Sequence, residues 1–565
     1  MKLNYKRTIF VGFAFFLICA FWQAYDNTIP LILTNKFGLS QTASGVVMAL
    51  DNILALFMLP LFGAISDKCR HKLGRRTPFI LIGTVIAAIA LVSLAFVDNM
   101  QRNNLDAVSK IDDPAALSLI YESQADQTLE YPDTLGRAEN DRSFVLKEKF
   151  TEDQFVQITA QVYLDGNTKT LYTTDASKKP LEEYPASLTE MLHKPENSAD
   201  WGTIERQPNK PVTNPQYANY VVPARDSYIW QITQGNMLPL ILFVVLLLVA
   251  LVAMSIFRSP AVALMPDVTI KPLRSKANAV INLMGSFGGV VVLGLGMVLA
   301  TSSVRNAMMS YIPFFGIIAI IMLLALLIFH WKVREPQFAK EMEDESKRLG
   351  IEDKDDDDSG SRKLSKGERR SLLFLLASIV LWFMGYNAVT SKYSVYATRI
   401  LFKDYNLTMI IAQAAAIFSY LPIGILSSKI GRKKTILAGI VMLTTAFLVA
   451  AFLRADSPGW LMNAMFVLAG IGWATINVNS FPMVVEMSRG SNVGKYTGIY
   501  YAASMAAQAL TPIFSGFLMD KLGLTVLFPY ATAFVALAFV TMMFVLHGDN
   551  KPTAKKGLEA LDVED

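Results

Sequence analysis

The chain alternates long runs of apolar residues with shorter polar connections. Runs of about 20 apolar residues or more suit helices that cross a hydrocarbon core about 30 Å thick. A soluble domain carries about 25% charged residues, whereas 18% of this chain is charged. The pattern predicts an all-α polytopic membrane protein with twelve transmembrane helices. Their expected positions are about 9–34, 41–66, 78–97, 237–257, 275–300, 311–332, 371–397, 406–428, 433–453, 459–486, 494–519 and 523–547.

The connections differ in charge on the two sides of the expected membrane. Every second connection is basic, and the short connections between them hold few cations. Because cytoplasmic loops are enriched in Lys and Arg, we expect a multi-pass protein of the cell membrane with both termini in the cytoplasm. The basic segments are 2–7, 68–76, 271–276, 362–370, 429–434 and 489–495.

One connection, residues 98–235, is long and acidic, with 22 acidic against 13 basic residues. The predicted topology places it outside the cell. Alternating residues on both sides of Asp165 and Gly166 predict a β-hairpin. We expect a small extracellular insert of mixed and β character that shields the outer mouth of the protein. Binding of a glycan or of a partner protein is the alternative.

The two halves of the chain resemble each other. The first span carries Trp22 and Tyr25, and the seventh carries Trp382 and Tyr386 about 360 positions later. Later matches are about 220 positions apart, and the difference is close to the length of the insert. This offset predicts two six-helix pseudo-repeats, with the insert in the first. The expected domains are an N-terminal six-helix bundle (1–97 and 236–332), the extracellular insert (98–235), a cytoplasmic linker (333–370), a C-terminal six-helix bundle (371–547) and a cytoplasmic tail (548–565).

The basic loop after the second span reads GAISDKCRHKLGRRTPFI, residues 63–80. It resembles the signature loop of the major facilitator superfamily, G-x-x-x-D-[RK]-x-G-R-[RK], with about four extra residues between Lys68 and Gly74. This long form and its TPFI ending resemble the plant sucrose/proton symporters, whose loop reads like D-R-C-…-G-R-R-R-P-F-I. The stretch Ala263–Ala279 is similar to A-L-x-x-D-L-T-…-R-x-x-A-N-A in that branch and in the glycoside-pentoside-hexuronide symporters. The acidic insert departs from the usual pattern of these families.

The resemblance implies a transporter that works by alternating access around a site between the two halves. At the predicted cytoplasmic face it implies an inner gate, in which carboxylates pair with arginines through charge-assisted hydrogen bonds. The alternative is topogenic charge on a solvated loop. The residues expected in the gate are Asp67, Arg75, Arg76, Asp267, Arg432 and Glu486.

Three ionisable residues fall inside apolar spans, namely Asp26, Asp51 and Lys392. An ionisable side chain in the membrane is costly and usually marks a functional or paired site. At 1.5 Å per helical residue, both carboxylates lie about 10–15 Å from the outer ends of their spans. We expect the three residues to form a titratable network that couples proton movement to transport. A structural ion pair between the halves is the alternative.

Aromatic and amide residues in the spans favour a neutral sugar as substrate. Indole rings stack on flat faces, and amides supply paired donors and acceptors for hydroxyl groups, although amides also bond between membrane helices. Arg258 is the exception, and we expect it to extend to the inner interface or to pair locally. The residues expected to bind substrate are Trp22, Gln23, Asn27, Asn278, Asn282, Trp382, Asn387, Trp473, Asn477 and Asn479.

Together these features predict a secondary active transporter, with proton-coupled import of a disaccharide or short oligosaccharide as the first hypothesis. The alternatives are a sodium-coupled symporter, an exporter of another small metabolite, and a membrane sensor that uses the insert. No P-loop, metal-ligand spacing or nucleophile–base pair appears in the sequence. We therefore expect no enzyme activity, no cofactor and no metal, an ion gradient as the energy source, and a monomer in the lipid bilayer that binds no nucleic acid.

Overall fold

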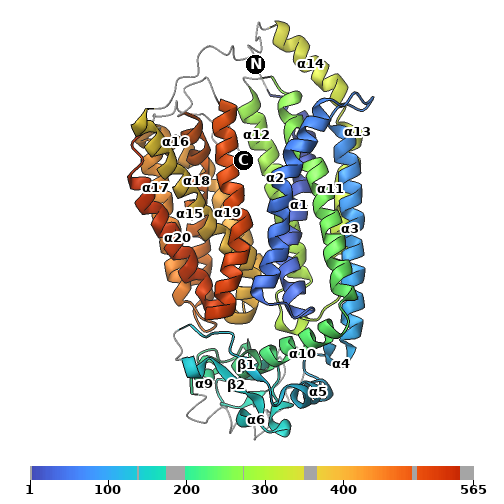
Figure 1. Cartoon of the computed structure of the whole chain (residues 1–565), viewed down its shortest axis with the longest axis vertical. Helices are drawn as coiled ribbons and strands as arrows, with labels where there is room; N and C mark the ends of the chain where they lie inside the picture. Colours follow the sequence, from blue (N-terminus) through green and yellow to red (C-terminus); the bar gives the residue numbers. More distant parts are fainter. Residues whose placement is uncertain are drawn as a thin grey trace.

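The computed structural model describes residues 3–135, 139–172, 198–270, 273–348, 365–486 and 493–547. Twelve long helices run side by side along the molecule (Figure 1). Within the described residues, eleven of them have the length and hydropathy of a membrane span, and α16 is the remaining long helix. The predicted all-α fold with twelve long helices is confirmed, and the chain is a multi-pass membrane protein.

The long helices fall into two consecutive sets of six. The first set, the N-half, is α1 (Tyr5–Asn35), α2 (Gln41–Asp67), α3 (Thr77–Asn104), α11 (Leu238–Asp267), α12 (Arg274–Val298) and α13 (Ile312–Lys332). The second set, the C-half, is α15 (Lys366–Tyr396), α16 (Tyr405–Ile430), α17 (Arg432–Phe452), α18 (Gly459–Glu486), α19 (Val493–Leu522) and α20 (Leu527–Met543). Short turns η6 (Ala397–Leu401) and η7 (Leu524–Val526) extend α15 and precede α20.

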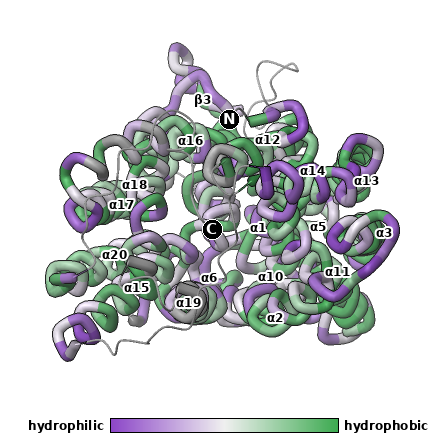
Figure 2. The backbone as a smooth tube through the Cα atoms, turned by 90° about the horizontal axis from the view of Figure 1, so that it is seen from above, coloured by the Kyte–Doolittle hydropathy of each residue, from purple (hydrophilic) through white to green (hydrophobic). Residues whose placement is uncertain are grey.

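Each half has its own hydrophobic core. Phe21, Leu94 and Phe257 belong to the core of the N-half, and Trp382 and Phe447 belong to that of the C-half. Seen from above, the two sets of helices lie on opposite sides of the molecule (Figure 2). The two six-helix halves expected from the sequence are therefore present as two separately packed units.

Polar residues at the ends of the apolar runs fix where helices begin. The Ser40 hydroxyl accepts a hydrogen bond from the Ala43 amide at the start of α2. Ser365 and Glu368 form a reciprocal capping box at the start of α15. The expected end of the fourth span, near residue 257, is wrong because α11 continues to Asp267. Arg258 and two prolines lower the local hydropathy there without breaking the helix.

The insert folds as a third unit between α3 and α11 (Figure 1). Its helices and turns are α4 (Asp106–Ser109), α5 (Pro114–Gln124), η1 (Glu139–Asp141), α6 (Leu146–Lys149), α7 (Glu152–Phe155), α9 (Ser198–Glu205), η3 (Tyr217–Val221) and α10 (Val222–Gly235). Its strands are β1 (Thr128–Glu130), β2 (Ser143–Val145), β3 (Gln161–Leu164), β4 (Leu171–Tyr172) and β5 (Pro211–Thr213). A core that includes Phe144, Phe155 and Tyr217 holds these elements together.

The β-hairpin predicted around Asp165 and Gly166 is confirmed. Strands β3 and β4 pair antiparallel, with Leu164 opposite Leu171, and β5 pairs with the other edge of β3. The remaining pair, β1 with β2, is also antiparallel. The described part of the insert is therefore of mixed character, with short strands and more helix than strand.

The two ends of the bundle carry different attachments. The insert lies at one end, which we call the insert end, and the basic loop lies at the other, which we call the loop end (Figure 1). A charged helix, α14 (Glu335–Arg348), follows the N-half at the loop end. The acidic run of the predicted linker and the predicted tail lie outside the described residues.

Candidate functional site

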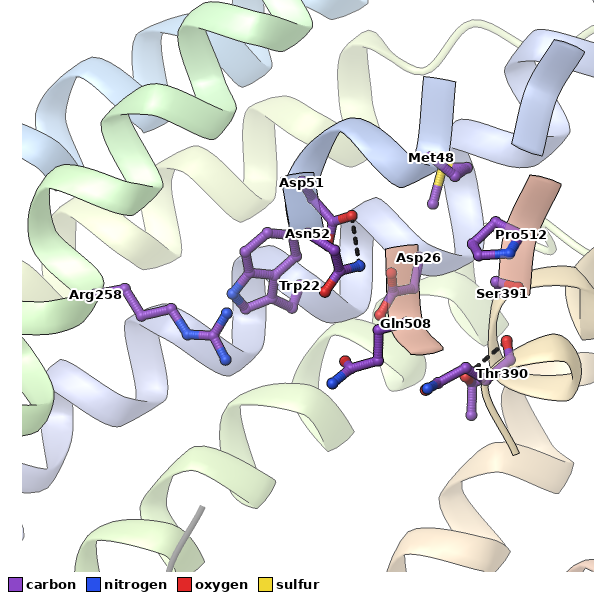
Figure 3. Close-up of a pocket in the computed structure, with 11 residues that line it drawn as sticks. Trp22, Asp26, Met48, Asp51, Asn52, Arg258, Thr390, Ser391, Gln508 and Pro512 are labelled. Carbon is purple, nitrogen blue, oxygen red and sulfur yellow. Dashed lines mark hydrogen bonds between the residues drawn. The ribbon is translucent and has the colours of Figure 1, made fainter. Parts of the chain in front are cut away.

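A cavity of about 170 Å³ lies between the two halves, half-way along the helices. The N-half contributes residues of α1, α2 and α11, and the C-half contributes residues of α15 and α19. Figure 3 shows the polar side chains of this set. The lining residues are Trp22, Asp26, Met48, Asp51, Asn52, Arg258, Asn387, Thr390, Ser391, Gln508 and Pro512.

Two carboxylates that the sequence singled out meet in this cavity. Asp26 comes from α1 and Asp51 from α2, and each is about nine or ten residues from the insert end of its helix. That spacing places both about 13–15 Å from that end. The Asn52 amide donates to Asp51 Oδ1 at 2.7 Å (Figure 3). The two carboxylates interact electrostatically, so this site places two titratable groups close together inside the bundle.

Arg258 supplies the positive charge of the cavity. Its guanidinium lies 5.6 Å from the centre of the Trp22 ring, and it interacts electrostatically with Asp26 and with Asp51. Of the two roles expected for Arg258, extension to the inner interface is wrong, and the interactions seen are local ones. Because α11 continues for nine residues beyond it, Arg258 lies inside the bundle and faces the cavity.

Lys392 lies apart from the two carboxylates with which it was expected to form a network. Its side chain is fully buried, and its ammonium donates to the Gln41 carbonyl at 2.8 Å. It also interacts electrostatically with Asp520. Lys392 therefore links α15 to the start of α2, whereas Arg258 is the cation that faces Asp26 and Asp51.

Two polar groups at the cavity lack hydrogen-bond partners within the described structure. They are the Trp22 indole Nε1 and the Asn387 amide Nδ2, and both are buried. A buried donor without a partner costs about 1–3 kcal/mol.

The other predicted substrate-binding residues lie outside the cavity lining. Trp382 is fully buried in the core of the C-half. Trp473 stacks on Tyr386 with ring centres 3.7 Å apart, so one face of its ring is occupied. Asn27 and Asn479 each donate to a carbonyl of their own helix, at 2.8 and 2.9 Å.

Gln23 connects the two halves next to the cavity, because the Gln413 amide of α16 donates to its Oε1 at 2.8 Å. The three remaining predicted substrate residues do not line the cavity, namely Asn278, Asn282 and Asn477. Amides in this protein thus serve helix contacts as well as the cavity.

Sequence reasoning missed several lining residues of α15 and the neighbouring helices. Thr390 and Ser391 lie one helical turn after Asn387, and this spacing of three and four residues places all three on one helix face. That spacing was the available signal. For Met48 and Pro512 the sequence contains no such signal, because isolated apolar residues in apolar spans look like packing residues.

The structure brings together four of the residues expected in the inner gate. Arg75 donates to both Asp267 oxygens, at 3.0 and 2.6 Å. Arg76 donates to Asp267 at 2.8 Å and pairs with Asp67 at 2.5 Å. All four belong to the N-half, so these contacts tie the basic loop to α11 within one half. Arg432 begins α17 in the C-half, and the Glu486 side chain lies outside the described residues.

A carboxylate that the sequence did not indicate supports the same loop. Glu335, at the start of α14, is buried. It accepts hydrogen bonds from the backbone amides of Arg75, Arg76 and Thr77 at 2.7–3.1 Å. Gly74 allows this approach, because its φ is +111° and a Cβ there would lie 2.3 Å from the Glu335 carboxylate.

Between the cavity and the insert end, α2 and α19 are in direct contact. A Cβ on Gly45 would lie 2.0 Å from the Pro512 carbonyl oxygen, and one on Gly516 would lie 2.2 Å from that of Gln41. Asp520 accepts from the amides of Gln41 and Thr42, at 2.7 Å each. A carboxylate from the C-half thus caps the first turn of an N-half helix.

Comparisons with known proteins give a consistent result. The sequence model of the Major Facilitator Superfamily matches residues 230–403 and 400–562, and the model described as MFS/sugar transport protein matches residues 10–110. Sucrose transport protein SUC3 of Arabidopsis thaliana is 39% identical over 67 residues, which are 12% of this chain and 11% of that protein. Sucrose transport protein SUT3 of Oryza sativa subsp. indica is 37% identical over 67 residues, 12% of this chain and 13% of that protein.

Solved structures share the fold over nearly the whole chain. The inward-open xylose transporter XylE from E. coli has a TM-score of 0.55 at 13% identity, covering 99% of both chains. An inward-facing bacterial homologue of the iron transporter ferroportin also has a TM-score of 0.55, at 10% identity, covering 96% of this chain and 99% of that one. The family resemblance predicted from the basic loop is confirmed.

Proposed function

Because this chain belongs to the Major Facilitator Superfamily, we propose that it is a secondary transporter that carries a neutral sugar by alternating access. The observation that carries the proposal is the central cavity between the halves. It combines two carboxylates, one arginine, an indole ring and several amides. The substrate we propose is a disaccharide or short oligosaccharide, which the matches to sucrose transport proteins favour.

The cavity suits a neutral polyhydroxyl ligand better than a charged one. Its one arginine already faces two carboxylates, Asp26 and Asp51, which leaves no free cation among the described lining residues for an anionic ligand. The unpartnered donors of Trp22 and Asn387 would bond to sugar oxygens, and the exposed part of the Trp22 ring would stack on the sugar face.

We further propose that protons drive this transport through Asp26 and Asp51. When both carboxylates are ionised, the set of two carboxylates and one arginine carries a net charge of minus one. Uptake of one proton by a carboxylate would make the set neutral. Sodium is the competing ion, because Asp51 and Asn52 offer neighbouring oxygen ligands.

Uptake into reconstituted vesicles tests the proposal. We expect labelled disaccharide to accumulate when the outside is acidic, without sodium. Asp26→Asn and Asp51→Asn should abolish accumulation but retain sugar exchange, because only the coupling step needs a titrating group. The control is Asp106→Asn, an exposed insert residue, which should transport like wild type. Accumulation driven by a sodium gradient alone would show that the coupling ion is sodium and not the proton. No uptake of any sugar in a panel of mono- and disaccharides would overturn the substrate class.

Substrate contacts can be tested separately from coupling. Trp22→Phe keeps an aromatic face and removes the indole N–H. We expect the KM for sugar to rise about tenfold, as for the loss of one hydrogen bond worth about 1.4 kcal/mol, with an unchanged dependence on the pH gradient. An unchanged KM would remove the Trp22 donor from the sugar site.

A further inference from the structure

The insert is fixed to the N-half by more than its chain connections. Gly38, in the turn between α1 and α2, lies so close to α10 that a Cβ there would be 2.6 Å from the Trp230 nitrogen. The Gln101 amide of α3 donates to the Lys36 carbonyl at 2.9 Å and to the Thr233 hydroxyl of α10 at 3.0 Å. The insert is therefore attached to the N-half by packing and hydrogen bonds as well as by its two chain connections.

The same insert contacts the C-half through the connection between α15 and α16. Arg399, in η6, pairs with Asp226 of α10, with Nη1 to Oδ2 at 2.5 Å. The guanidinium also donates to Asn35 at the end of α1, at 2.7 Å. One arginine of the C-half is thus held by both the insert and the N-half.

The other two connections of the C-half at this end also contact the insert. Asp456, between α17 and α18, pairs with Arg206 at 2.6 Å. At the start of η7, the Leu524 amide donates to the Pro132 carbonyl at 2.8 Å, and the Thr525 hydroxyl donates to Asp133 at 2.6 Å. The insert therefore bridges to all three connections that the C-half presents at the insert end.

A second, smaller cavity of about 50 Å³ marks the seam that these contacts cover. Asn35 of α1, Asp226 of the insert and Arg399 of η6 all line it. Burial raises the pKa of Asp226, and the Arg399 charge opposes that rise. Removing Arg399 would leave a carboxylate in the seam without its main counter-charge.

We propose that the insert is a latch that holds the insert end of the transporter closed. In alternating access the two halves separate at one end while they close at the other. Because the insert moves with the N-half, opening at the insert end breaks its contacts with the C-half. The latch therefore favours the state that is closed at the insert end, whichever substrate is carried.

Accessibility of the central cavity tests the latch without measuring transport. In a protein with Cys19 and Cys69 replaced by Ser, Ser391→Cys places a thiol in the cavity wall. A membrane-impermeant maleimide is added at the insert side of sealed vesicles. Arg399→Gln should raise the labelling rate about fivefold, the lower end of ordinary coupling between two conformations.

A matched control separates the latch from loss of charge in general. Arg305 of the N-half pairs with Asp112 of the insert at 3.9 Å, a contact that stays within the body that moves together. Arg305→Gln should leave labelling unchanged. A thiol at the exposed Thr168 of the insert reports the orientation of the vesicles.

If Arg399→Gln damages folding, exchanging the charges of Arg399 and Asp226 tests the same contact. Asp226→Arg and Arg399→Asp should each increase labelling, and the double exchange should return it towards the starting rate. Equal labelling in all variants, or no recovery in the double exchange, would overturn the latch.

Discussion

The two ends of the helical bundle use charged residues differently. At the loop end, Arg75 and Arg76 pair with Asp267 within the N-half. At the insert end, Lys36 and Asp98 also pair within the N-half, but Asp520 of the C-half contacts the N-half, and Arg399 contacts both Asn35 of the N-half and Asp226 of the insert. Charges within one half stabilise that half in any conformation, whereas charges across the halves select one conformation. Charged clusters of similar composition therefore have different roles, which depend on whether the two partners belong to the same half or to units that separate.

The largest effect is expected at the buried ion pair of the insert end. Lys36 and Asp98 are fully buried and 2.7 Å apart, and Lys36 also donates to the Met309 carbonyl. Lys36→Ala should lower the free energy of unfolding by about 3–5 kcal/mol, because it leaves a buried carboxylate alone. Thermal and denaturant unfolding in detergent measures this change. The double variant Lys36→Met/Asp98→Leu should recover most of the loss, and an equal loss in the double variant would contradict the reasoning.

The next effect concerns the contact between α2 and α19. Gly45→Ala adds a Cβ that would lie 2.0 Å from the Pro512 carbonyl, which should cost the closed state about 1–3 kcal/mol. The maleimide added at the insert side should therefore label the thiol introduced by Ser391→Cys at a higher rate. Gly294→Ala is the control, because nothing lies within 4 Å of a Cβ there. Equal labelling in both variants would show that α2 and α19 do not close the path.

An effect of similar size, but on the stability of the N-half and not on the closed state, is expected at the loop end. Asp267→Asn should cost about 1.5–3 kcal/mol, because both arginines lose a charge-assisted partner. The labelling rate from the insert side should stay unchanged, since these contacts lie within the N-half. A change in labelling would instead make Asp267 part of a gate between the halves.

The smallest effect is expected for the exposed ion pair of the latch. Arg206 is 60% exposed in its contact with Asp456, so Arg206→Ala should change stability by at most about 1 kcal/mol. Labelling from the insert side should increase less than with Arg399→Gln. A larger increase would move the main contact of the latch to the connection between α17 and α18.

The sequence predicted the fold well because hydropathy and charge are properties of single residues. Runs of apolar residues located twelve long helices, and the turn signal at Asp165 located the β3–β4 hairpin. The end of α11 was missed, because Arg258 reads as an interface residue until helix packing shows the cavity beside it. Hydropathy cannot distinguish a charge at a membrane surface from one at an internal cavity.

Part of the candidate site was predicted from the sequence because it consists of polar residues in apolar spans. Asp26, Asp51, Trp22 and Asn387 meet in the cavity, since polar residues are rare enough in apolar spans to stand out. Lys392 stood out equally and lies elsewhere, because its partner is the Gln41 carbonyl. Any residue can supply a carbonyl, so sequence patterns do not reveal such a partner.

The buried pair of Lys36 and Asp98 has a consequence for the synthesis of the chain. Lys36 emerges 62 residues before Asp98 and 273 residues before the Met309 carbonyl. During membrane insertion, the Lys36 ammonium at the end of α1 therefore has no charged partner until α3 has been made, and its last partner, the Met309 carbonyl, arrives with the connection between α12 and α13. The whole insert is synthesised between these two events, so the chain of the insert is complete before the last partner of Lys36 has been made.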